Sequence, residues 1–375
     1  MDGYNSHIHA TIAFARENKT DLQAYCRQHG TPPYLEKYQK HQRNAMVLLS
    51  LEQPVELCWF LDLSLPHLEK TINNPDYKHY TLKKKRGGER QISAPKEQLK
   101  KMQKRLNYFL QAYYLWIKPP EVHGFVINPH YLGTHCNIVA NADVHKGKKH
   151  VLNMDLKDFF PSISAKRIKN LFTSSYFNYD EPMAIALTLL TTYQAKLPTG
   201  APTSPVLSNF VCLAFDAQLR EFCQRNDLKF TRYADDLTFS SDALISIETI
   251  QRIKQLVIEN GFEINEKKLR LQSSSRKQTV TGLTVNEKVN VDRKLLKKIR
   301  AMLHDLRTNG IETATKRHFN PHLEVDAKMQ SYFLRRLEGY INFVGQVRGK
   351  KDGDYLKLKQ LFEEFFVDKK RFSKP

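Results

Sequence analysis

The spacing of hydrophobic residues along the chain changes between helical and strand-like periods. From 97 to 117 apolar residues recur every three or four positions, which predicts one long amphipathic helix that ends before Pro119-Pro120. VLNMDL (151–156) is a short continuous apolar run typical of a buried strand. FTRYADDLTFS (230–240) predicts two short strands joined at a pair of aspartates. Because helices and strands are mixed without strict alternation, the predicted fold class is α+β.

Turn and cap residues indicate where other elements begin and end. Gly87-Gly88 lies between two extended stretches and predicts a β-hairpin with a basic tip. Ser204 followed by Pro205 predicts the N-cap of a helix that continues through VLSNFVCLAFDAQLREF. A further helix should end at Asn260-Gly261, and Asp292 should cap another whose apolar stripe includes Ile299. Prolines interrupt the first 75 residues, which predicts short helices there.

The chain carries a large positive charge. Its 375 residues include 59 Lys and Arg against 39 Asp and Glu, a formal net charge of +20 with a pI near 9.6. The excess is concentrated in 81–105 and from 286 to the end, on either side of a more neutral middle. Such a charge attracts a polyanion, and nucleic acid is favoured over an anionic membrane surface.

Other features of the composition bear on the compartment. No apolar run approaches the length of a membrane span, and the amino terminus lacks a basic region followed by an apolar one. The five cysteines are scattered and form no CxxC pair, which argues against a disulfide framework or a structural zinc site. We therefore expect a cytoplasmic protein with no membrane partner.

Three aspartates are candidates for metal binding. Asp155 ends the predicted strand 151–156, and Asp235 and Asp236 lie at the predicted turn between two strands. Side chains at a turn can converge, and an aspartate from a neighbouring strand would complete a cluster of acceptor oxygens. Mg²⁺ prefers such oxygen ligands and keeps positions open for water and phosphate. The alternative for each residue alone is a solvated turn or a strand-end cap.

Three segments resemble reverse transcriptases in order and spacing. TRYADDLTFS resembles the YxDD signature, NMDLKDFFPSI resembles the upstream aspartate motif, and LPTGAPTSPVLSN resembles the stretch between them. NADVH (141–145) and VTG (280–282) fit the NAxxH and VTG elements of bacterial retron reverse transcriptases. The resemblance covers 75–300 and implies a right-hand polymerase with an antiparallel palm sheet, whose three aspartates hold two Mg²⁺ ions.

The resemblance also implies a set of nucleotide-binding residues. Arg90 would contact the incoming triphosphate, with Lys84 or Lys85 beside it, because an arginine fork matches phosphate oxygens. Phe160 falls where the family places an aromatic ring under the sugar, which would exclude a 2′-hydroxyl and select dNTP. Its alternative is a core phenylalanine. Asp158 would bind near the sugar or triphosphate, or is simply a surface charge.

The segment LPTGAP departs from the family at one position. Thr199 stands where the family commonly has glutamine, which puts a direct nucleotide contact by that residue in doubt. Gly200 and the following Ser-Pro turn match the family, so Gly200 is retained among the nucleotide-binding candidates.

A second set of residues is expected to bind RNA. Asn141 and His145 would recognise the cognate RNA of the retron, and Thr281 and Gly282, with Val280, would allow a strand to approach the backbone closely. The alternatives are a polar loop for the first pair and a β-turn for the second group. The helix after Asp292 suits a thumb helix that grips phosphates through exposed lysines: Lys294, Lys297 and Lys298.

The predicted organisation has three parts: a helical region over 1–75, fingers and palm over 76–285, and a basic helical thumb over 286–375. The resemblance implies an RNA-directed DNA polymerase that uses dNTPs and copies part of a cognate non-coding RNA, primed from a guanosine 2′-hydroxyl, into msDNA, a branched RNA–DNA hybrid. It also implies an effector protein from the same operon and a role in anti-phage defence.

Two alternatives are distinguishable from this function. A group II intron-like or CRISPR-associated reverse transcriptase would usually carry further maturase or nuclease portions. A nucleic-acid-binding scaffold without catalysis, which sequesters an effector, would not need three intact aspartates.

Overall fold

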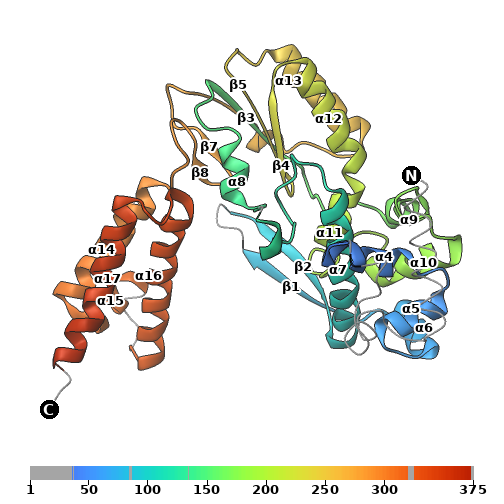
Figure 1. The fold of residues 1–375 in the computed structure, drawn as a ribbon, viewed down its shortest axis with the longest axis horizontal. Coiled ribbons are helices and arrows are strands. Elements are labelled where there is room, and N and C mark those ends of the chain that lie inside the picture. The colour runs from blue at the N-terminus through green and yellow to red at the C-terminus, as the bar shows by residue number, and fades with distance from the viewer. Residues whose placement is uncertain (1–35, 37, 84–86, 134, 320–324, 373–375) are drawn as a thin grey trace. The chain divides into compact units, whose positions relative to one another are not determined.

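The structure is a computed structural model that describes residues 36, 38–83, 87–133, 135–319 and 325–372, with side chains as far as 365 apart from that of Trp59. Helices and strands are mixed along the chain (Figure 1), which confirms the α+β class. In the amino-terminal half the elements are α4 Lys40–Leu49, α5 Pro54–Leu61, α6 Leu65–Asn73, β1 Tyr77–Lys83, β2 Glu89–Pro95, α7 Glu97–Ile117, η1 His130–Leu132, α8 Ile138–Asp143, β3 His150–Asp155, α9 Ala165–Thr173 and α10 Glu181–Thr191.

The second half contains the remaining described strands and the carboxy-terminal helices. Its elements are α11 Ser204–Val211, α12 Leu213–Arg225, β4 Lys229–Tyr233, β5 Asp236–Ser241, α13 Ile247–Glu259, η2 Glu266–Lys268, β6 Arg270–Ser273, β7 Thr279–Val280, β8 Leu283–Thr284, α14 Arg293–Thr308, α15 Gly310–Phe319, α16 Ala327–Arg348 and α17 Gly353–Phe372. None of the helices in the described ranges is long and apolar enough to cross a bilayer.

Contacts divide the chain into two compact units, each described here by itself. The first comprises Met1–Asn137, Asn153–Leu237 and Ile245–Arg270, and the second comprises Ile138–Leu152, Thr238–Leu244 and Leu271–Pro375. The second unit therefore joins the carboxy-terminal helices to three short segments that precede residue 286. The three-part division at 75 and 285 stays a prediction.

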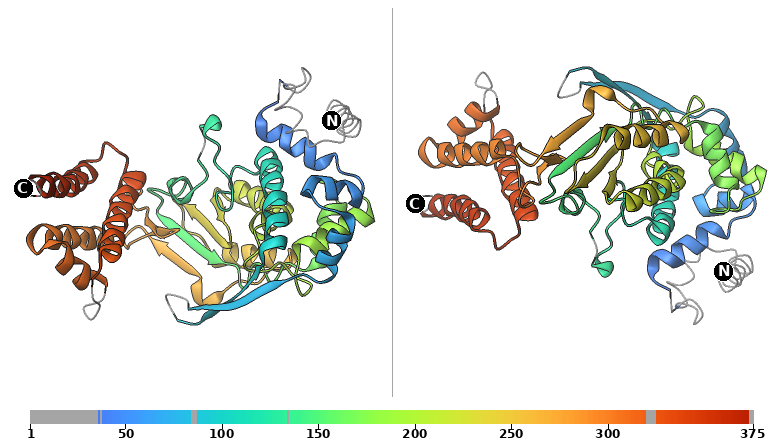
Figure 2. Two further views of the ribbon diagram at one scale, coloured as in Figure 1. Left: turned by 90° about the horizontal axis from the view of Figure 1, so that it is seen from below. Right: turned by 90° about the horizontal axis from the view of Figure 1, so that it is seen from above.

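The first unit contains the predicted basic hairpin and the long helix. β1 and β2 pair in antiparallel register from Tyr77 opposite Pro95 to Lys83 opposite Glu89, as the Gly87-Gly88 pair predicts. α7 has the predicted bounds, and it packs against α4 and α11 through an apolar face. α4, α5 and α6 are the described members of the short amino-terminal helices. Figure 2 shows the hairpin as a long extended ribbon in two further views.

A four-stranded sheet carries the candidate aspartates, and its strand order is β4-β5-β3-β6. Only Ala234 and Asp235 connect β4 to β5, and a connection of two residues permits only an antiparallel pair. α12 packs on β4, and α13 packs in turn on α12. The two strands expected around the paired aspartates are therefore confirmed, as is the strand that ends at Asp155.

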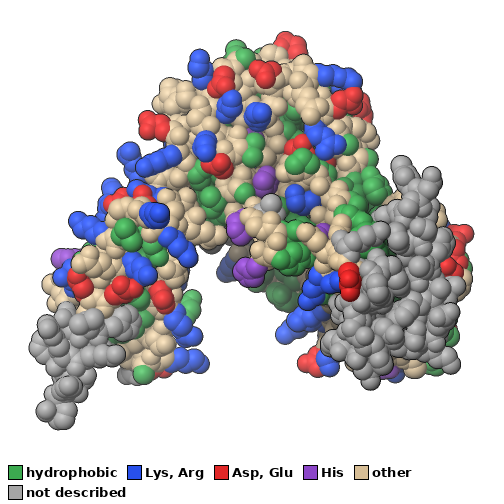
Figure 3. Space-filling view, in the orientation of Figure 1, with side chains coloured by type: hydrophobic (Ala, Val, Ile, Leu, Met, Phe, Trp, Pro, Cys, Tyr) green, Lys and Arg blue, Asp and Glu red, His purple; other side chains and the backbone are tan. Residues whose placement is uncertain are grey.

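The second unit has a hydrophobic core of its own. β7, β8 and α8 contribute Val280, Leu283 and Ala142, and the helices from α14 onward contribute residues such as Met302 and Phe333, all of them 2% exposed or less. α14 begins at the predicted cap, where the Asp292 side chain accepts a hydrogen bond from the backbone N–H of Lys294. Figure 3 shows Lys and Arg interspersed with Asp and Glu over these helices.

The helix predicted after Ser204 differs from the structure in two details. Thr203, not Ser204, is the N-cap residue, since the helix already includes Ser204, whose hydroxyl donates to the carbonyl of Pro198 at 2.7 Å. The predicted single helix is also two helices, α11 and α12, which meet at Cys212. The apolar spacing continues across this junction, so hydrophobic periodicity alone does not reveal it.

Candidate active site

The backbone brings the three aspartates together. Asp155 is the last residue of β3, Asp236 is the first residue of β5, and Asp235 lies in the turn before it. β3 and β5 are neighbours in the sheet. The backbone N–H of Leu156, the residue after Asp155, donates to the carbonyl of Asp235 at 2.9 Å. Asp155 and Asp235, 80 positions apart in the sequence, are thus adjacent at the ends of neighbouring strands, as the sequence predicts.

The electrostatics of the three aspartates reflect their proximity. Desolvation raises the pKa of Asp235, and the charge of Asp155 adds to this effect, while Lys268 and Arg90 oppose it. Desolvation and the charges of Asp235 and Asp155 raise the pKa of Asp236 to about 7, although the residue keeps an exposed surface. Carboxylates that disfavour one another's charge are stabilised by cations, so the cluster is suited to bind them.

Lys268 supplies one such cation. Its ammonium group lies 2.8 Å from Oδ1 and 2.7 Å from Oδ2 of Asp155. The segment that carries it is held beside Asp155, since the backbone N–H of Asn265 donates to the carbonyl of Asp155 at 2.8 Å. Sequence reasoning missed Lys268, because one lysine among many, 113 residues from its partner, gives no signal.

The three aspartates have the oxygen ligands that suit a divalent metal ion. Carboxylate oxygens are the ligands Mg²⁺ takes, and an ammonium group already stands against Asp155 as a substitute cation. Within the described part of the chain, no three His, Cys, Asp or Glu side chains already have the arrangement of a metal site. Since Lys268 engages both oxygens of Asp155, metal binding would require that ion pair to open.

The predicted nucleotide-binding residues lie in different places. Arg90 is exposed on β2 and close enough to influence the pKa of Asp235. Phe160 is half-buried and stacks on Phe125, with ring centroids 5.7 Å apart. Asp158 is exposed, with a backbone φ of +45°. Both Lys84 and Lys85 lie outside the described residues. The roles of all five residues stay predictions.

Gly200 has a packing reason to be glycine. A Cβ there would lie 2.7 Å from the carbonyl oxygen of Ser93 and 3.0 Å from Cα of Ala94, both in β2. The glycine therefore lets its loop approach the strand that carries Arg90. Thr199 beside it is half-buried, and a direct contact between Thr199 and a nucleotide stays in doubt.

The residues of the NAxxH element are buried. His145 is fully buried, and its Nδ1 lies 2.7 Å from the hydroxyl oxygen of Ser240 on β5. Asn141 is 1% exposed, and neither its amide oxygen nor its amide nitrogen has a hydrogen-bond partner. Neither side chain can touch RNA in this conformation. The structure favours an internal role for His145, so direct recognition of RNA by these residues stays an untested prediction.

The VTG element forms the turn between β7 and β8. Thr281 and Gly282 both have positive φ, at +46° and +84°, as a tight two-residue hairpin turn requires. Val280 is fully buried, and the Thr281 hydroxyl donates to the carbonyl of Ile138 at 3.2 Å. Only Gly282 is exposed, with nothing within 4 Å of a Cβ added there. The β-turn alternative therefore describes the observed geometry, and contact with RNA stays a prediction for Gly282 above all.

The lysines of α14 are available to a ligand. Lys294, Lys297 and Lys298 are all exposed. Lys298 also lies over the ring of Tyr340, 5.2 Å from its centroid, and Arg336 donates to the Tyr340 hydroxyl at 2.8 Å. This surface combines cations with the aromatic ring of Tyr340, and such a combination can bind phosphates and stacked bases.

Comparison with known proteins identifies the class. The family described as reverse transcriptase (RNA-dependent DNA polymerase) matches residues 82–285, more than half of the chain. The chain therefore belongs to the reverse transcriptase family, the RNA-directed DNA polymerases, and the expected right-hand polymerase fold is confirmed.

Individual relatives show which group of reverse transcriptases the chain resembles, the retron reverse transcriptases. The retron Ec86 reverse transcriptase of Escherichia coli is 31% identical over 300 residues, which cover 77% of this chain and 88% of that protein. The retron Mx65 and Mx162 reverse transcriptases of Myxococcus xanthus are 35% and 30% identical, over 63% and 61% of this chain. The chain is a retron reverse transcriptase by family, although the match spans only 57% and 52% of the two myxobacterial proteins.

Among solved structures, a telomerase from Candida albicans is similar with a TM-score of 0.45 and 9% identity, over 78% of this chain and 64% of that one. At this level the likeness carries no argument about this chain.

Proposed function

We propose that this protein polymerises dNTPs on an RNA template at the site formed by Asp155, Asp235 and Asp236. The observation that carries this proposal is the proximity of Asp155 to the turn of Asp235 and Asp236: their backbones are joined by the bond from Leu156 N–H to Asp235 O, and the charge of Asp155 adds to the desolvation that raises the pKa of Asp235 and of Asp236. Membership of the reverse transcriptase family supports it.

The chain's own residues have defined tasks in this reaction. The three aspartates would hold two Mg²⁺ ions, which when bound would supply Lewis-acid activation of the attacking hydroxyl and neutralisation of the leaving pyrophosphate. Arg90, on the exposed hairpin, orients the triphosphate, and a fixed cation there stabilises the charge that develops on the transferring phosphoryl group. The ring of Phe160, held against Phe125, limits the space beside the sugar and favours dNTP over rNTP.

The template and primer follow from the retron relatives. We propose that the enzyme copies part of a cognate non-coding RNA and begins from a guanosine 2′-hydroxyl, so that the product is msDNA. The exposed lysines of α14, one of which lies over the ring of Tyr340, support binding of structured RNA. We also place the protein in an anti-phage system with an effector protein from the same operon, on the family resemblance alone.

This function is tested by isolating the nucleic acid that the protein makes. The chain is expressed together with the genomic segment upstream of its reading frame, and the bound nucleic acid is digested with DNase and with RNase separately. We expect a hybrid in which DNA remains linked to RNA through a 2′-phosphodiester that a debranching enzyme cleaves. The same preparation from an Asp155→Asn variant should contain RNA without DNA. Wild-type material that carries only RNA would overturn the proposal.

A further inference from the structure

The turn that carries the catalytic aspartates has a strained backbone. Ala234, between Tyr233 and Asp235, has a φ of +59° and is 5% exposed. An L-residue with a side chain adopts this left-handed conformation only when its surroundings hold it there. Some part of the protein must therefore fix this turn.

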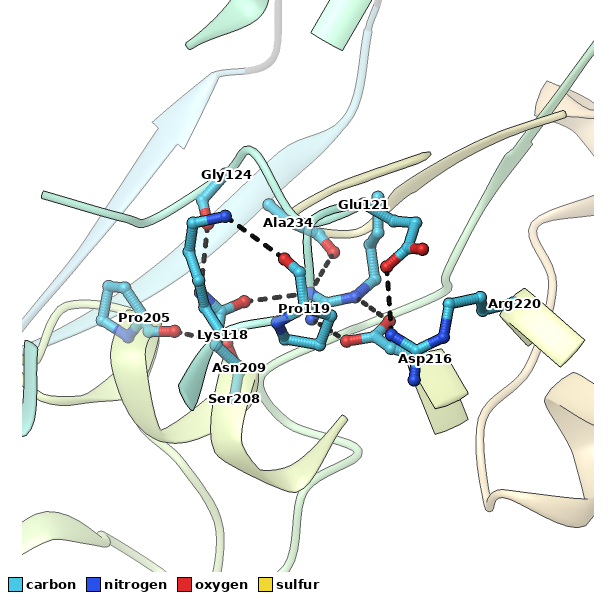
Figure 4. A network of polar contacts seen from close by, with 11 residues as sticks. Lys118, Pro119, Glu121, Gly124, Pro205, Ser208, Asn209, Asp216, Arg220 and Ala234 are labelled. Atoms are coloured by element: carbon cyan, nitrogen blue, oxygen red, sulfur yellow. Dashed lines mark hydrogen bonds and ion pairs between the residues drawn. The ribbon is translucent and has the colours of Figure 1, made fainter. Parts of the chain in front are cut away.

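A buried arginine contacts the turn directly. Arg232 is completely buried, and its Nη1 donates to the carbonyl of Ala234 at 3.2 Å and to Oδ1 of Asn209 at 2.9 Å. Its Nε and Nη2 donate to the two carboxylate oxygens of Asp216, at 2.7 and 2.6 Å. Figure 4 shows Asn209, Asp216 and Ala234 with these bonds drawn as dashed lines. One guanidinium group thus links β4, α11, α12 and the turn.

The buried charges of Asp216 and Arg232 are not explained by a gain in the stability of the fold. Asp216 and Arg232 are both 0% exposed, so two charges have been removed from water. Burial acts to lower the pKa of Arg232, yet the carboxylate of Asp216 raises it, so the guanidinium stays charged. Buried ion pairs are often matched or exceeded in stability by apolar residues of similar size. The guanidinium group does provide several hydrogen-bond donors in a fixed planar geometry.

Gly124 packs directly against the backbone of the turn. A Cβ on Gly124 would lie 2.4 Å from the backbone nitrogen of Ala234 and 2.9 Å from the carbonyl carbon of Tyr233. Asn209 contacts this glycine too, since its Nδ2 donates to the carbonyl of Gly124 at 3.0 Å. The segment before Gly124 also pairs with the backbone of Arg232. Asn209 therefore connects both sides of the enclosure around the turn.

We propose that Arg232, together with Asp216 and Asn209, is a positioning clamp that sets the conformation of the Ala234 turn and so the placement of Asp235 and Asp236. This inference rests on the proposed polymerase function. The side chains of all three clamp residues are fully buried, so none of them is open to a substrate. They act through the carbonyl of Ala234 and the packing of Gly124.

The test removes both buried charges together, because one alone would leave an unpaired buried charge. In the Arg232→Met, Asp216→Leu double variant we expect cooperative unfolding, RNA–DNA duplex affinity and KM for dNTP close to wild type. We expect kcat to fall by about 100-fold, the loss that follows a misplacement of about 1 Å. Mn²⁺ affinity, measured by electron paramagnetic resonance without nucleic acid, should fall as well, which a merely structural role would not cause.

Two further variants keep the test decisive. Arg225→Met breaks an exposed ion pair on α12, the helix that carries Asp216, and should leave kcat unchanged. If the double variant does not fold, Asn209→Ala, which retains both charges, replaces it and should show the same loss of kcat at constant KM. A folded double variant, or a folded Asn209→Ala variant, with wild-type kcat and Mn²⁺ affinity would overturn the clamp. An inactive wild-type protein would instead refute the polymerase function.

Discussion

The ion pair between Lys268 and Asp155 predicts competition between an internal ammonium group and metal ions. Both carboxylate oxygens of Asp155 are within 2.8 Å of the lysine nitrogen. The carboxylate must therefore separate from Lys268 before it can bind a metal ion. Replacing Lys268 with methionine keeps an unbranched side chain of similar length and removes its charge. We therefore expect the Lys268→Met variant to bind divalent ions more tightly than wild type.

The size of the effect follows from the exposure of the two partners. The Asp155 side chain is 11% exposed but Lys268 is 55% exposed, so water screens much of the attraction. Exposed pairs contribute about 0.2 to 1 kcal/mol, and the contact with both oxygens places this one toward about 1 to 2 kcal/mol. Since about 1.4 kcal/mol corresponds to a tenfold change, the Kd for a divalent ion should decrease roughly fivefold to thirtyfold.

Mn²⁺ titration followed by electron paramagnetic resonance, without nucleic acid or dNTP, measures this Kd directly. The neighbouring Lys267 is exposed, and Lys267→Met serves as the matched control that should bind Mn²⁺ as wild type does. Lys268→Met should also have a lower melting temperature than wild type in EDTA and recover it with Mg²⁺, because bound metal then neutralises the carboxylates. A Kd within twofold of wild type would refute the competition.

Three other predictions concern RNA binding, stability and sugar selection. Combined replacement of Lys294, Lys297 and Lys298 by alanine should reduce the slope of log affinity against log salt by about 2 to 3 for an RNA–DNA duplex, measured by fluorescence anisotropy; an unchanged slope would contradict the phosphate contacts. Desolvation, with the nearby charge of Lys118, lowers the pKa of His123 to about 4, so the free energy of unfolding should fall as pH decreases from about 6.5 toward 4. Denaturant titrations should show a weaker pH dependence for His123→Gln, and an equal dependence would exclude His123 as its source. Phe160→Ala should increase incorporation of rNTP relative to dNTP in primer extension, whereas unchanged discrimination would make Phe160 a core residue.

Local signals in the sequence predicted much of the fold and the acidic cluster. The Gly87-Gly88 hairpin, the helix 97–117 and the cap at Asp292 depend on spacing and turn chemistry that act over a few residues. The approach of Asp155 to the Ala234-Asp235 turn was predicted because both lie at the ends of apolar strands. Strand ends of one sheet can meet at one edge, and here they do.

The residues that sequence reasoning missed act over long distances. Arg232 lies within the motif TRYADD, but its burial depends on Asp216 and Asn209, which α12 and α11 bring to it. Lys268 meets Asp155 only because 263–268 runs beside β3. Nothing in the identity of a lysine or an arginine in so basic a chain distinguishes a surface charge from an internal one.

Burial also separates the RNA-binding candidates. His145 appears in the sequence as a polar loop residue, yet Ser240, 95 residues away, meets it inside the second unit. The turn at Thr281 could be foreseen from Gly282, which favours positive φ. The exposed α14 lysines and Gly282 are therefore the parts of the predicted RNA surface that are open to a ligand in this conformation.

Primer extension tests the central claim most directly. Purified full-length protein is incubated with an RNA template, an annealed DNA primer, dNTPs and Mg²⁺, alongside Asp235→Asn and a control, Asp227→Asn, which alters an exposed aspartate in the turn before β4. The account predicts extension by wild type and by Asp227→Asn, and no extension by Asp235→Asn. Failure of the wild-type protein to extend the primer, or equal extension by Asp235→Asn, would contradict it.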